Sequence, residues 1–265
     1  MDVRSLAFRT DLALLSLGGS EIEDRGTRIV VRTPANPTFH WGNFILLDRP
    51  PAAAEVEELL AASDAEFPAA RHRAFGVDGV DDQSAALAPL IAAGLALHMG
   101  VVLTADAVHE PPRPNGTAQY RTLTSDDDWA QRVQLAADCN DEYPPAEYLL
   151  FATRKAAYER GLTEAGHGAW WGAWVDGRLV STLGLFRAGV GLARFQSVET
   201  HPAHRGRGLA GTLVHRASQY GFAALAARTL VMVADPGYSA IRVYRSVGFT
   251  DTEHQSQVQQ TNRYG

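Results

Sequence analysis

The sequence predicts an α/β (α+β) protein built from two related halves. Apolar runs with helical spacing alternate with short β-like runs along the chain, and 46% of the residues are hydrophobic, enough for packed cores. The segment 110–116 holds three prolines and an Asn-Gly pair, a pattern typical of a linker. Aligning Gly94 with Gly248 gives both halves the order strand, helix, glycine, apolar residue, strand. We therefore expect two domains, 1–112 and 117–265.

The first half begins with an apolar stretch that predicts a helix over 5–17, ended by Gly18-Gly19. Two further helices are expected at 52–62 and 82–93, and Gly94 stops the last of them. The remaining apolar runs predict strands at 20–24, 28–33, 41–48, 71–77 and 96–104.

The second half carries the clearer local signals. Ser125 and the three aspartates after it predict a helix to about 137, because serine caps a first turn and acidic residues favour its dipole. Asp176-Gly177 between two alternating apolar runs predicts a β-hairpin. The other expected elements are helices at 145–161, 209–223 and 239–247, strands at 119–123, 169–175, 178–187, 193–199 and 229–234, and a terminal strand ending at 260.

Composition and charge exclude several classes of protein. The formal net charge is −6, and residues 1–115 carry 9 arginines against 16 acidic residues, which argues against a broad nucleic-acid surface there. No apolar run approaches the ~20 residues that span a bilayer. The first residues lack a secretory pattern, and the single Cys139 excludes a disulfide scaffold or a cysteine-rich metal site. We expect a cytoplasmic monomer or homodimer without metal, membrane or nucleic acid.

The run 195–211 is the most informative, because a strand leads into a glycine-rich turn in which a helix starts. Gly206 and Gly208 have no β-carbon, so their amides can approach a ligand closely. Successive amides at a helix N-terminus favour an anion, and Arg205 and Arg207 add charge-assisted hydrogen bonds to phosphate. The pattern predicts a phosphate-binding loop rather than an ordinary turn.

One class of phosphate loop is that of dinucleotide-binding proteins. The segment 206–211 fits their glycine pattern, and Asp235 lies near the distance expected for a ribose contact. That pattern requires the first glycine directly after a parallel strand. Here residues including Pro202 separate Glu199 from Gly206, and the preceding strands are expected to form an antiparallel meander. The dinucleotide alternative, which predicts NAD binding, is therefore disfavoured.

The segment 205–210 instead resembles motif A (Arg/Gln-x-x-Gly-x-Gly/Ala) of the GNAT superfamily of N-acetyltransferases. Residues 235–249 resemble the family's motif B, with Ala240, then Tyr244, then Gly248-Phe249. The order of elements over 118–261 also matches the family. The resemblance implies two GNAT-like domains, each with a central mixed, mostly antiparallel sheet flanked by helices, the second of which binds acetyl-CoA.

The resemblance also assigns residues to the donor. The backbone edge left by a splayed strand would pair with the pantetheine arm of acetyl-CoA at Val198 and Thr200. The amides of the motif A loop would hold its pyrophosphate, and that loop consists of Arg205, Gly206, Arg207, Gly208, Leu209 and Ala210.

For catalysis, Tyr244 matches the tyrosine that protonates the leaving thiolate in many family members. Gly237 stands where motif B usually has an asparagine that contacts the cofactor. The positions of the family's base are Gln196 and Arg194, neither of which is a base at neutral pH. The candidate general base is Glu199, provided that a bulge changes the alternation of its strand.

The first half is expected to be a degenerate copy. It reads Arg-Pro-Pro-Ala-Ala-Ala over 49–54, without the glycines of motif A, and Leu90 takes the place of the tyrosine. In this it resembles tandem proteins of the superfamily, mycothiol synthases among them. The expected function is transfer of an acetyl group from acetyl-CoA to a primary amine of a small molecule or peptide, by direct attack in a ternary complex. The alternative is a non-catalytic acyl-CoA-binding or regulatory module.

Overall fold

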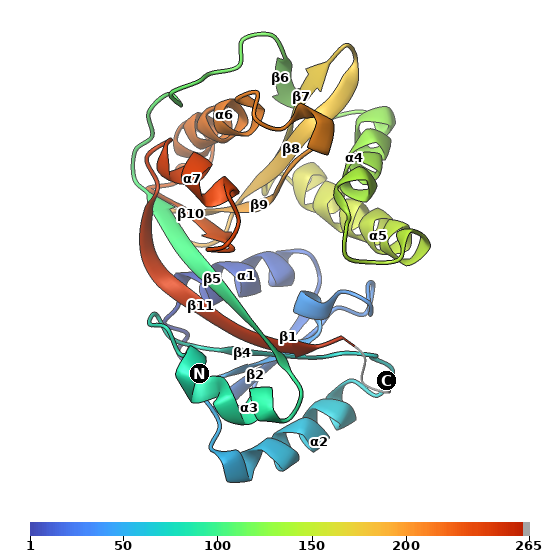
Figure 1. The fold of residues 1–265 in the computed structure, drawn as a ribbon, viewed down its shortest axis with the longest axis vertical. Helices are drawn as coiled ribbons and strands as arrows, with labels where there is room; N and C mark the ends of the chain where they lie inside the picture. The colour runs from blue at the N-terminus through green and yellow to red at the C-terminus, as the bar shows by residue number, and fades with distance from the viewer. Residues whose placement is uncertain (262–265) are drawn as a thin grey trace. The chain divides into compact units, whose positions relative to one another are not determined.

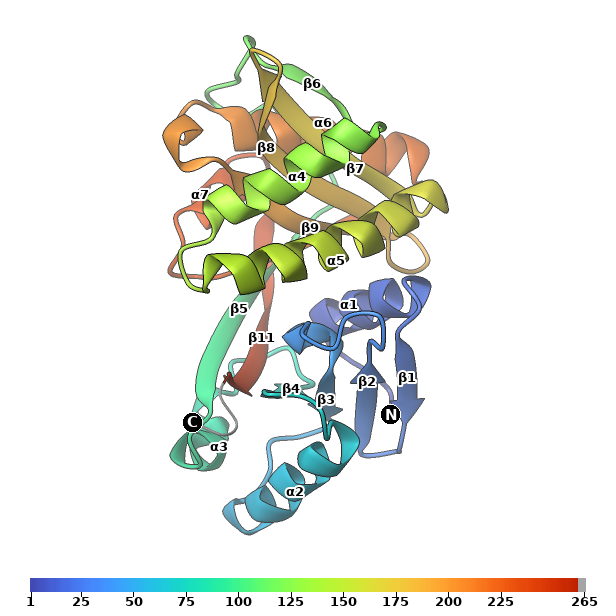
Figure 2. The ribbon, with the colours of Figure 1, turned by 90° about the vertical axis from the view of Figure 1, so that its right-hand side faces the viewer.

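The computed structural model describes residues 1–261, which form two compact units (Figures 1 and 2). The first unit comprises Met1–Val102, Val233–Pro236 and the described residues from Asp251 onward; the second comprises Leu103–Met232 and Gly237–Thr250. The boundaries of these compact units thus differ from the boundary between the predicted domains, 1–112 and 117–265. The proline-rich linker lies in the second unit, and the terminal strand returns to the first.

The first unit contains a mixed, mostly antiparallel sheet. Its strand order is β1 (Glu21–Asp24), β2 (Arg28–Arg32), β3 (Phe44–Leu47), β4 (Arg73–Val77), β11 (Thr250–Gln260) and β5 (Ala96–Ala105), which ends in the second unit. The pairs β1–β2, β2–β3 and β4–β11 are antiparallel, whereas β3–β4 is parallel. The predicted strands of the first half are therefore present, with the one expected at 41–48 shortened because His40–Gly42 form a 3₁₀ turn.

Helices cover both faces of the first sheet. Helix α1 (Leu6–Leu17) packs on one face, where Phe8 meets Val31 and Leu46. Helix α2 (Val56–Glu66) packs on the other, in the cluster that holds the fully buried Leu90. The helix predicted at 82–93 is a 3₁₀ turn (Ser84–Leu87) followed by the short α3 (Ala88–Ala92). Proline at position 89 explains the late start, since it is tolerated only in a first helical turn.

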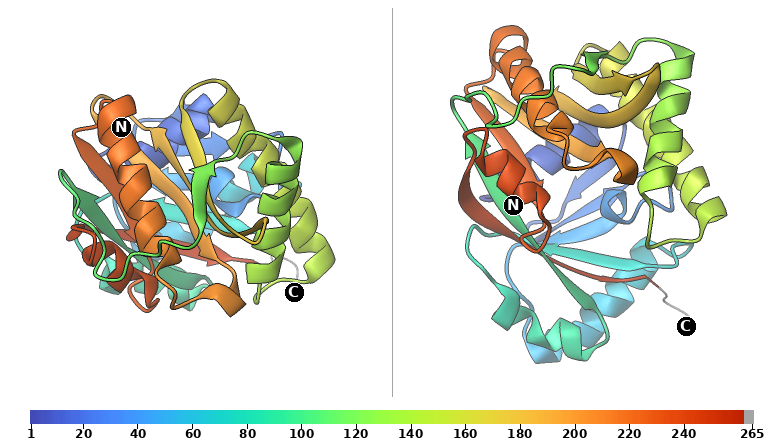
Figure 3. Two further views of the ribbon diagram at one scale, coloured as in Figure 1. Left: turned by 90° about the horizontal axis from the view of Figure 1, so that it is seen from above. Right: turned by 45° about the horizontal axis from the view of Figure 1, so that its top comes forward.

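The second unit has the strand order β10 (Thr229–Ala234), β9 (Leu192–Thr200), β8 (Arg178–Arg187), β7 (Gly168–Val175) and β6 (Gln119–Thr122). Its strands are antiparallel except for the parallel pair β9–β10. Figure 3 shows α4 (Asp126–Cys139) and α5 (Pro145–Glu164) on one face of this sheet and α6 (Leu209–Ala224) on the other. The short α7 (Ala240–Arg245) follows β10, and Gly248 (φ +115°) lies just beyond it.

The predicted hairpin is confirmed, since Asp176-Gly177 joins β7 and β8. Both residues have positive φ (+50° and +77°), as a two-residue turn of this handedness requires. The hairpin sets the register of β7 against β8, and β9 pairs along the other edge of β8. No helix among residues 1–261 combines the length and apolar character needed to cross a membrane.

The predicted cap of α4 is also confirmed, and Asp128 is its centre. The Ser125 hydroxyl accepts a hydrogen bond from the Asp128 amide at 3.1 Å, and the Asp128 carboxylate accepts one from the Ser125 amide at 3.1 Å. The guanidinium of Arg121 donates two hydrogen bonds to the same carboxylate at 2.6 and 2.7 Å. This pairing with Arg121 holds the pKa of the nearly buried Asp128 well below its usual range.

Asp128→Asn is expected to lower the free energy of unfolding at pH 7 by about 1–3 kcal/mol, because a buried charge-assisted pair is lost. The folded-state pKa lies below the unfolded value of ~3.9, so this stabilisation is present above about pH 4 and lost as the pH falls toward the folded value. Urea unfolding measures the free energy of unfolding of variant and wild type, and the difference between them should be smaller at pH 3 than at pH 7. Asp127→Asn, at an exposed position in the same turn, is the control. An equal loss of unfolding free energy in this control would contradict the stabilising role of the Asp128 pairing.

Candidate functional site

The glycine-rich turn lies at the N-terminus of α6, directly after a 3₁₀ turn at Pro202–His204. Gly206 and Gly208 both adopt left-handed φ values, +75° and +77°. A β-carbon at Gly206 would meet nothing within 4 Å, whereas one at Gly208 would collide with the carbonyl oxygen of Arg113. Gly206 is thus favoured by backbone conformation alone, and Gly208 also by the close approach of the chain at Arg113.

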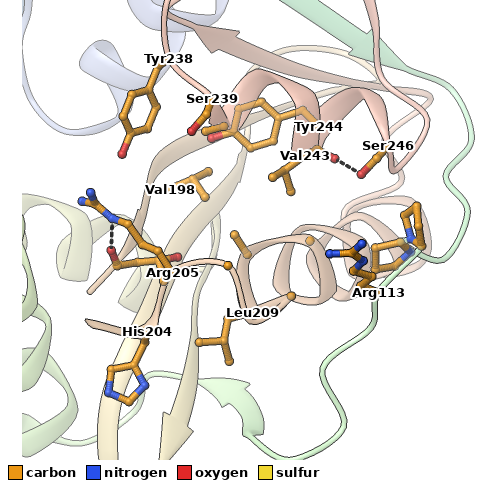
Figure 4. Close-up of a pocket in the computed structure, with 18 residues that line it drawn as sticks. Arg113, Val198, His204, Arg205, Leu209, Tyr238, Ser239, Val243, Tyr244 and Ser246 are labelled. Carbon is orange, nitrogen blue, oxygen red and sulfur yellow. Dashed lines mark hydrogen bonds between the residues drawn. The ribbon is translucent and has the colours of Figure 1, made fainter. Parts of the chain in front are cut away.

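A cavity of about 370 Å³ lies beside this turn, between β9, α6, α7 and the chain before β6 (Figure 4). Among residues 1–261, no acidic side chain lines it, whereas two arginines, Arg113 and Arg205, do. The open amides of a helix N-terminus and an excess of positive charge suit a ligand with negative charge. The lining residues are Pro111, Pro112, Arg113, Val198, Thr200, His204, Arg205, Gly206, Gly208, Leu209, Ala210, Gly211, Tyr238, Ser239, Ala240, Val243, Tyr244 and Ser246.

Strand β9 presents part of its edge to this cavity. It pairs with β10 only over three residues, Leu192–Arg194, and within residues 1–261 the rest of β9 has no ladder partner on that side. Val198 and Thr200, which lie in the part of β9 that does not pair with β10, line the cavity. An extended amide-bearing ligand can therefore add to this edge as a further strand would.

Strand β9 contains a β-bulge, but it lies before Val198, so Glu199 and Thr200 still point to opposite sides of the strand. The register between β8 and β9 shifts between Thr182 and Gly184, and Ser197 has φ +41°, a value that non-glycine residues rarely adopt. The Oγ of Ser197 accepts a hydrogen bond from Nζ of Lys155 at 2.7 Å. The bulge changes the alternation of β9 just before Val198.

Tyr244 lies on α7 and lines the cavity with only 6% of its surface exposed (Figure 4). Burial, with a smaller contribution from Tyr238, raises the pKa of Tyr244 above its usual range. Among residues 1–261 its hydroxyl has no hydrogen-bond partner. The phenol is therefore protonated at neutral and mildly alkaline pH and has a proton to donate.

Seven of the eight predicted donor-binding residues line this cavity; Arg207 does not. The guanidinium of Arg205 donates a hydrogen bond to the Thr200 carbonyl at 3.1 Å, drawn as a dashed line in Figure 4. Arg207 donates to the Ala203 carbonyl at 3.1 Å. His204 also lines the cavity, and burial together with the nearby Arg207 lowers the pKa of its imidazole.

Glu199 does not line the cavity but belongs to a cluster of charged side chains. Its carboxylate pairs with the buried Arg132 guanidinium at 2.8 Å, and Arg132 also lies 3.4 Å from the carboxylate of Glu159. Lys155 lies 3.5 Å from Glu159, and burial raises the pKa of that carboxyl group. The cluster comes from α4, α5 and β9, and 21% of the Glu199 side chain is exposed.

Several residues of the cavity wall were not predicted from the sequence. Ala240, Val243 and Tyr244 have the i, i+3, i+4 spacing of one helix face, so the motif around Tyr244 contained the signal for its two neighbours. Pro111, Pro112 and Arg113 carried no such signal, because the segment that contains them has the composition of a linker. Across residues 1–261 no three His, Cys, Asp or Glu side chains gather as a metal would require.

Known proteins show what the chain is similar to. Residues 129–249 match the family model described as Acetyltransferase (GNAT) family, whereas no curated protein matches this sequence. A functionally unknown conserved protein from Staphylococcus epidermidis superposes with a TM-score of 0.72 at 9% identity, over 92% of this chain and 95% of that one. A GCN5-related N-acetyltransferase from Kribbella flavida superposes with a TM-score of 0.65 at 16% identity, over 98% of each chain.

A tandem GNAT protein from the clavulanic acid biosynthesis pathway has a TM-score of 0.56 at 14% identity, over 93% of this chain and 87% of its own. At these identities the likeness shows a shared fold. The predicted resemblance and the predicted fold class are confirmed, and the family match favours motif A over the dinucleotide alternative. Residues 129–249 of the chain thus match the GNAT acetyltransferase family, and the whole chain shares the fold of solved GNAT proteins.

Proposed function

We propose that the protein is an acetyl-CoA-dependent N-acetyltransferase whose active site is the cavity of the second unit. The observation that carries the proposal is that one cavity combines the open N-terminus of α6, an unpaired edge of β9 and the unpartnered hydroxyl of Tyr244. The match of residues 129–249 to the GNAT family model supports acyl transfer as the reaction type. The acceptor that we propose is a primary amine of a small molecule or peptide in the cytoplasm.

The residues of the cavity fit the chemistry of the donor. The amides of the turn at 205–210 would bind the pyrophosphate, since they lie at a helix N-terminus and no carboxylate of the described residues lines the cavity. Arg205 would add a charge-assisted hydrogen bond. The backbone of Val198 and Thr200 would pair with the amides of the pantetheine arm.

In the proposed reaction the amine nitrogen attacks the thioester carbonyl carbon, and the carbon–sulfur bond then breaks. Tyr244 donates its proton to the leaving thiolate, and burial keeps the phenol protonated until that step. The ammonium proton passes through water to Glu199, which does not line the cavity, and Arg132 fixes the position of that carboxylate. Most of the rate would come from holding amine and thioester together.

We propose that the first unit does not bind acetyl-CoA. The chain after β3 reads Arg49-Pro50-Pro51, and proline supplies no amide proton for a phosphate. Leu90, aligned with Tyr244, is fully buried in the core of its unit and brings no hydroxyl to a site. The protein would therefore have one acetyl-CoA site, in the second unit.

Calorimetric titration of the full chain with acetyl-CoA, CoA and NAD tests the proposal, followed by thiol-release assays with amines of several classes. We expect both CoA forms to bind, NAD not to bind, and thiol release to require an amine. Binding without thiol release for any amine would favour the alternative of a non-catalytic acyl-CoA module. If neither CoA form binds, the proposal is wrong.

A further inference from the structure

The segment 111–115, which we call the strap, lies against the first turns of α6. The Asn115 amide donates a hydrogen bond to Oγ1 of Thr212 at 2.8 Å, and the Asn115 side chain donates one to the Arg207 carbonyl at 2.9 Å. Buried Pro111 lies so close to Gly211 that a β-carbon there would sit 3.2 Å from it. The strap is thus packed onto the same turn that carries the glycines of motif A.

The strap is held at both ends. Before it, the His109 amide donates a hydrogen bond to the Val247 carbonyl at 3.0 Å. After it, the Asn115 side-chain oxygen accepts hydrogen bonds from the amides of Thr117 and Ala118 at 3.1 and 3.0 Å. A segment tethered in this way loses little further backbone entropy when a ligand binds beside it.

Arg113 is the cationic residue of the strap. Its side chain is exposed, lines the cavity, and has no hydrogen bond or ion pair within residues 1–261. Figure 4 shows it beside α6, on the side of the cavity away from Arg205. The cavity therefore has two separate cationic positions, and within the described part of the chain no acidic side chain lines it.

We propose that the strap is part of the donor site and that Arg113 binds the phosphate monoester on the ribose of CoA. This inference rests on the proposed function. CoA carries phosphate at two places, the pyrophosphate and the ribose 3′-phosphate, and the cavity has two cationic positions. The turn with Arg205 accounts for the pyrophosphate, so the free guanidinium of Arg113 faces the other group. An arginine fork suits the oxygens of a phosphate monoester, and the monoester carries close to two negative charges at neutral pH.

The test compares CoA with 3′-dephospho-CoA on the wild type and on Arg113→Gln, by calorimetric titration of the full chain. We expect the substitution to weaken CoA binding about tenfold and to leave binding of 3′-dephospho-CoA unchanged. Arg154→Gln is the matched control, because Arg154 is an exposed arginine of the same unit that does not line the cavity. It should change neither affinity.

An Asn115→Ala variant tests whether the strap positions Arg113. As a single substitution, Asn115→Ala should weaken CoA binding. Added to Arg113→Gln, it should have almost no further effect on CoA binding. An equal loss for both ligands in Arg113→Gln would overturn the assignment to the ribose phosphate, and unchanged CoA binding would overturn any role of Arg113. If the wild type binds neither ligand, the proposed function fails first and this inference with it.

Discussion

Gly206→Asp is expected to bind acetyl-CoA about 100-fold more weakly than Gly206→Asn. Both residues tolerate the left-handed backbone of position 206 better than other side chains do, and a β-carbon there meets nothing within 4 Å. The two variants have the same shape and differ by one negative charge, which would lie beside the bound pyrophosphate. A loss of 100-fold corresponds to about 2.7 kcal/mol, within the range for like charges a few ångströms apart near a protein surface.

Calorimetric titration of the two variants measures this difference, and thermal unfolding without ligand checks that both fold alike. High salt should reduce the difference, because it screens the repulsion between exposed charges. Equal affinities for the aspartate and asparagine variants at low salt would show that the phosphate groups bind elsewhere. Gly208 is unsuitable for this test, since any side chain there also displaces the strap at Arg113.

Tyr244→Phe is expected to lower kcat about 100-fold while leaving the KM for acetyl-CoA nearly unchanged, because it removes only the proton donor to the leaving thiolate. The hydroxyl has no protein partner within residues 1–261, so its loss leaves no buried group unsatisfied. Stability should therefore be close to that of the wild type. Steady-state kinetics with the best acceptor, together with thermal unfolding, measures both effects.

Tyr238→Phe is the matched control, since Tyr238 lines the same cavity but is half exposed. It should keep the kcat of the wild type. The pH dependence gives a second readout: the acid must be protonated to act, and burial raises the pKa of Tyr244, so wild-type kcat should not fall between pH 7 and pH 9 through loss of this proton. A Tyr244→Phe enzyme with wild-type kcat would exclude the role of general acid.

The strap has the composition of a linker but is packed against a helix. Prolines and an Asn-Gly pair are typical of a connection between domains, and the chain at 110–116 does leave the end of β5 to reach β6. Asn115 nevertheless makes its hydrogen bonds with α6 and the turn before it, and Pro111 is buried. Composition describes the backbone freedom of a segment, whereas the surface that it packs on depends on residues about 100 positions away.

Local features of this protein were determined by the sequence alone. Asp176-Gly177 forms the hairpin, Ser125 and Asp128 cap α4, and Gly206 and Gly208 take the left-handed conformations of the turn before α6. Each depends on backbone preferences and hydrogen bonds among residues close in the chain, which adjacent residue types suffice to specify. The position of Tyr244 was instead predicted from the resemblance of residues 235–249 to motif B.

The tertiary structure decided what depends on distant residues. The bulge at Ser197, the pairing of Glu199 with Arg132 and the return of β11 to β4 all join segments far apart in the chain. The sequence alone places the carboxylate of Glu199 beside a predicted phosphate loop and indicates no partner for it. Only the packing of α4 on β9 shows that its partner is Arg132. Side-chain contacts and strand neighbours follow from the packing of whole elements, so no local pattern specifies them.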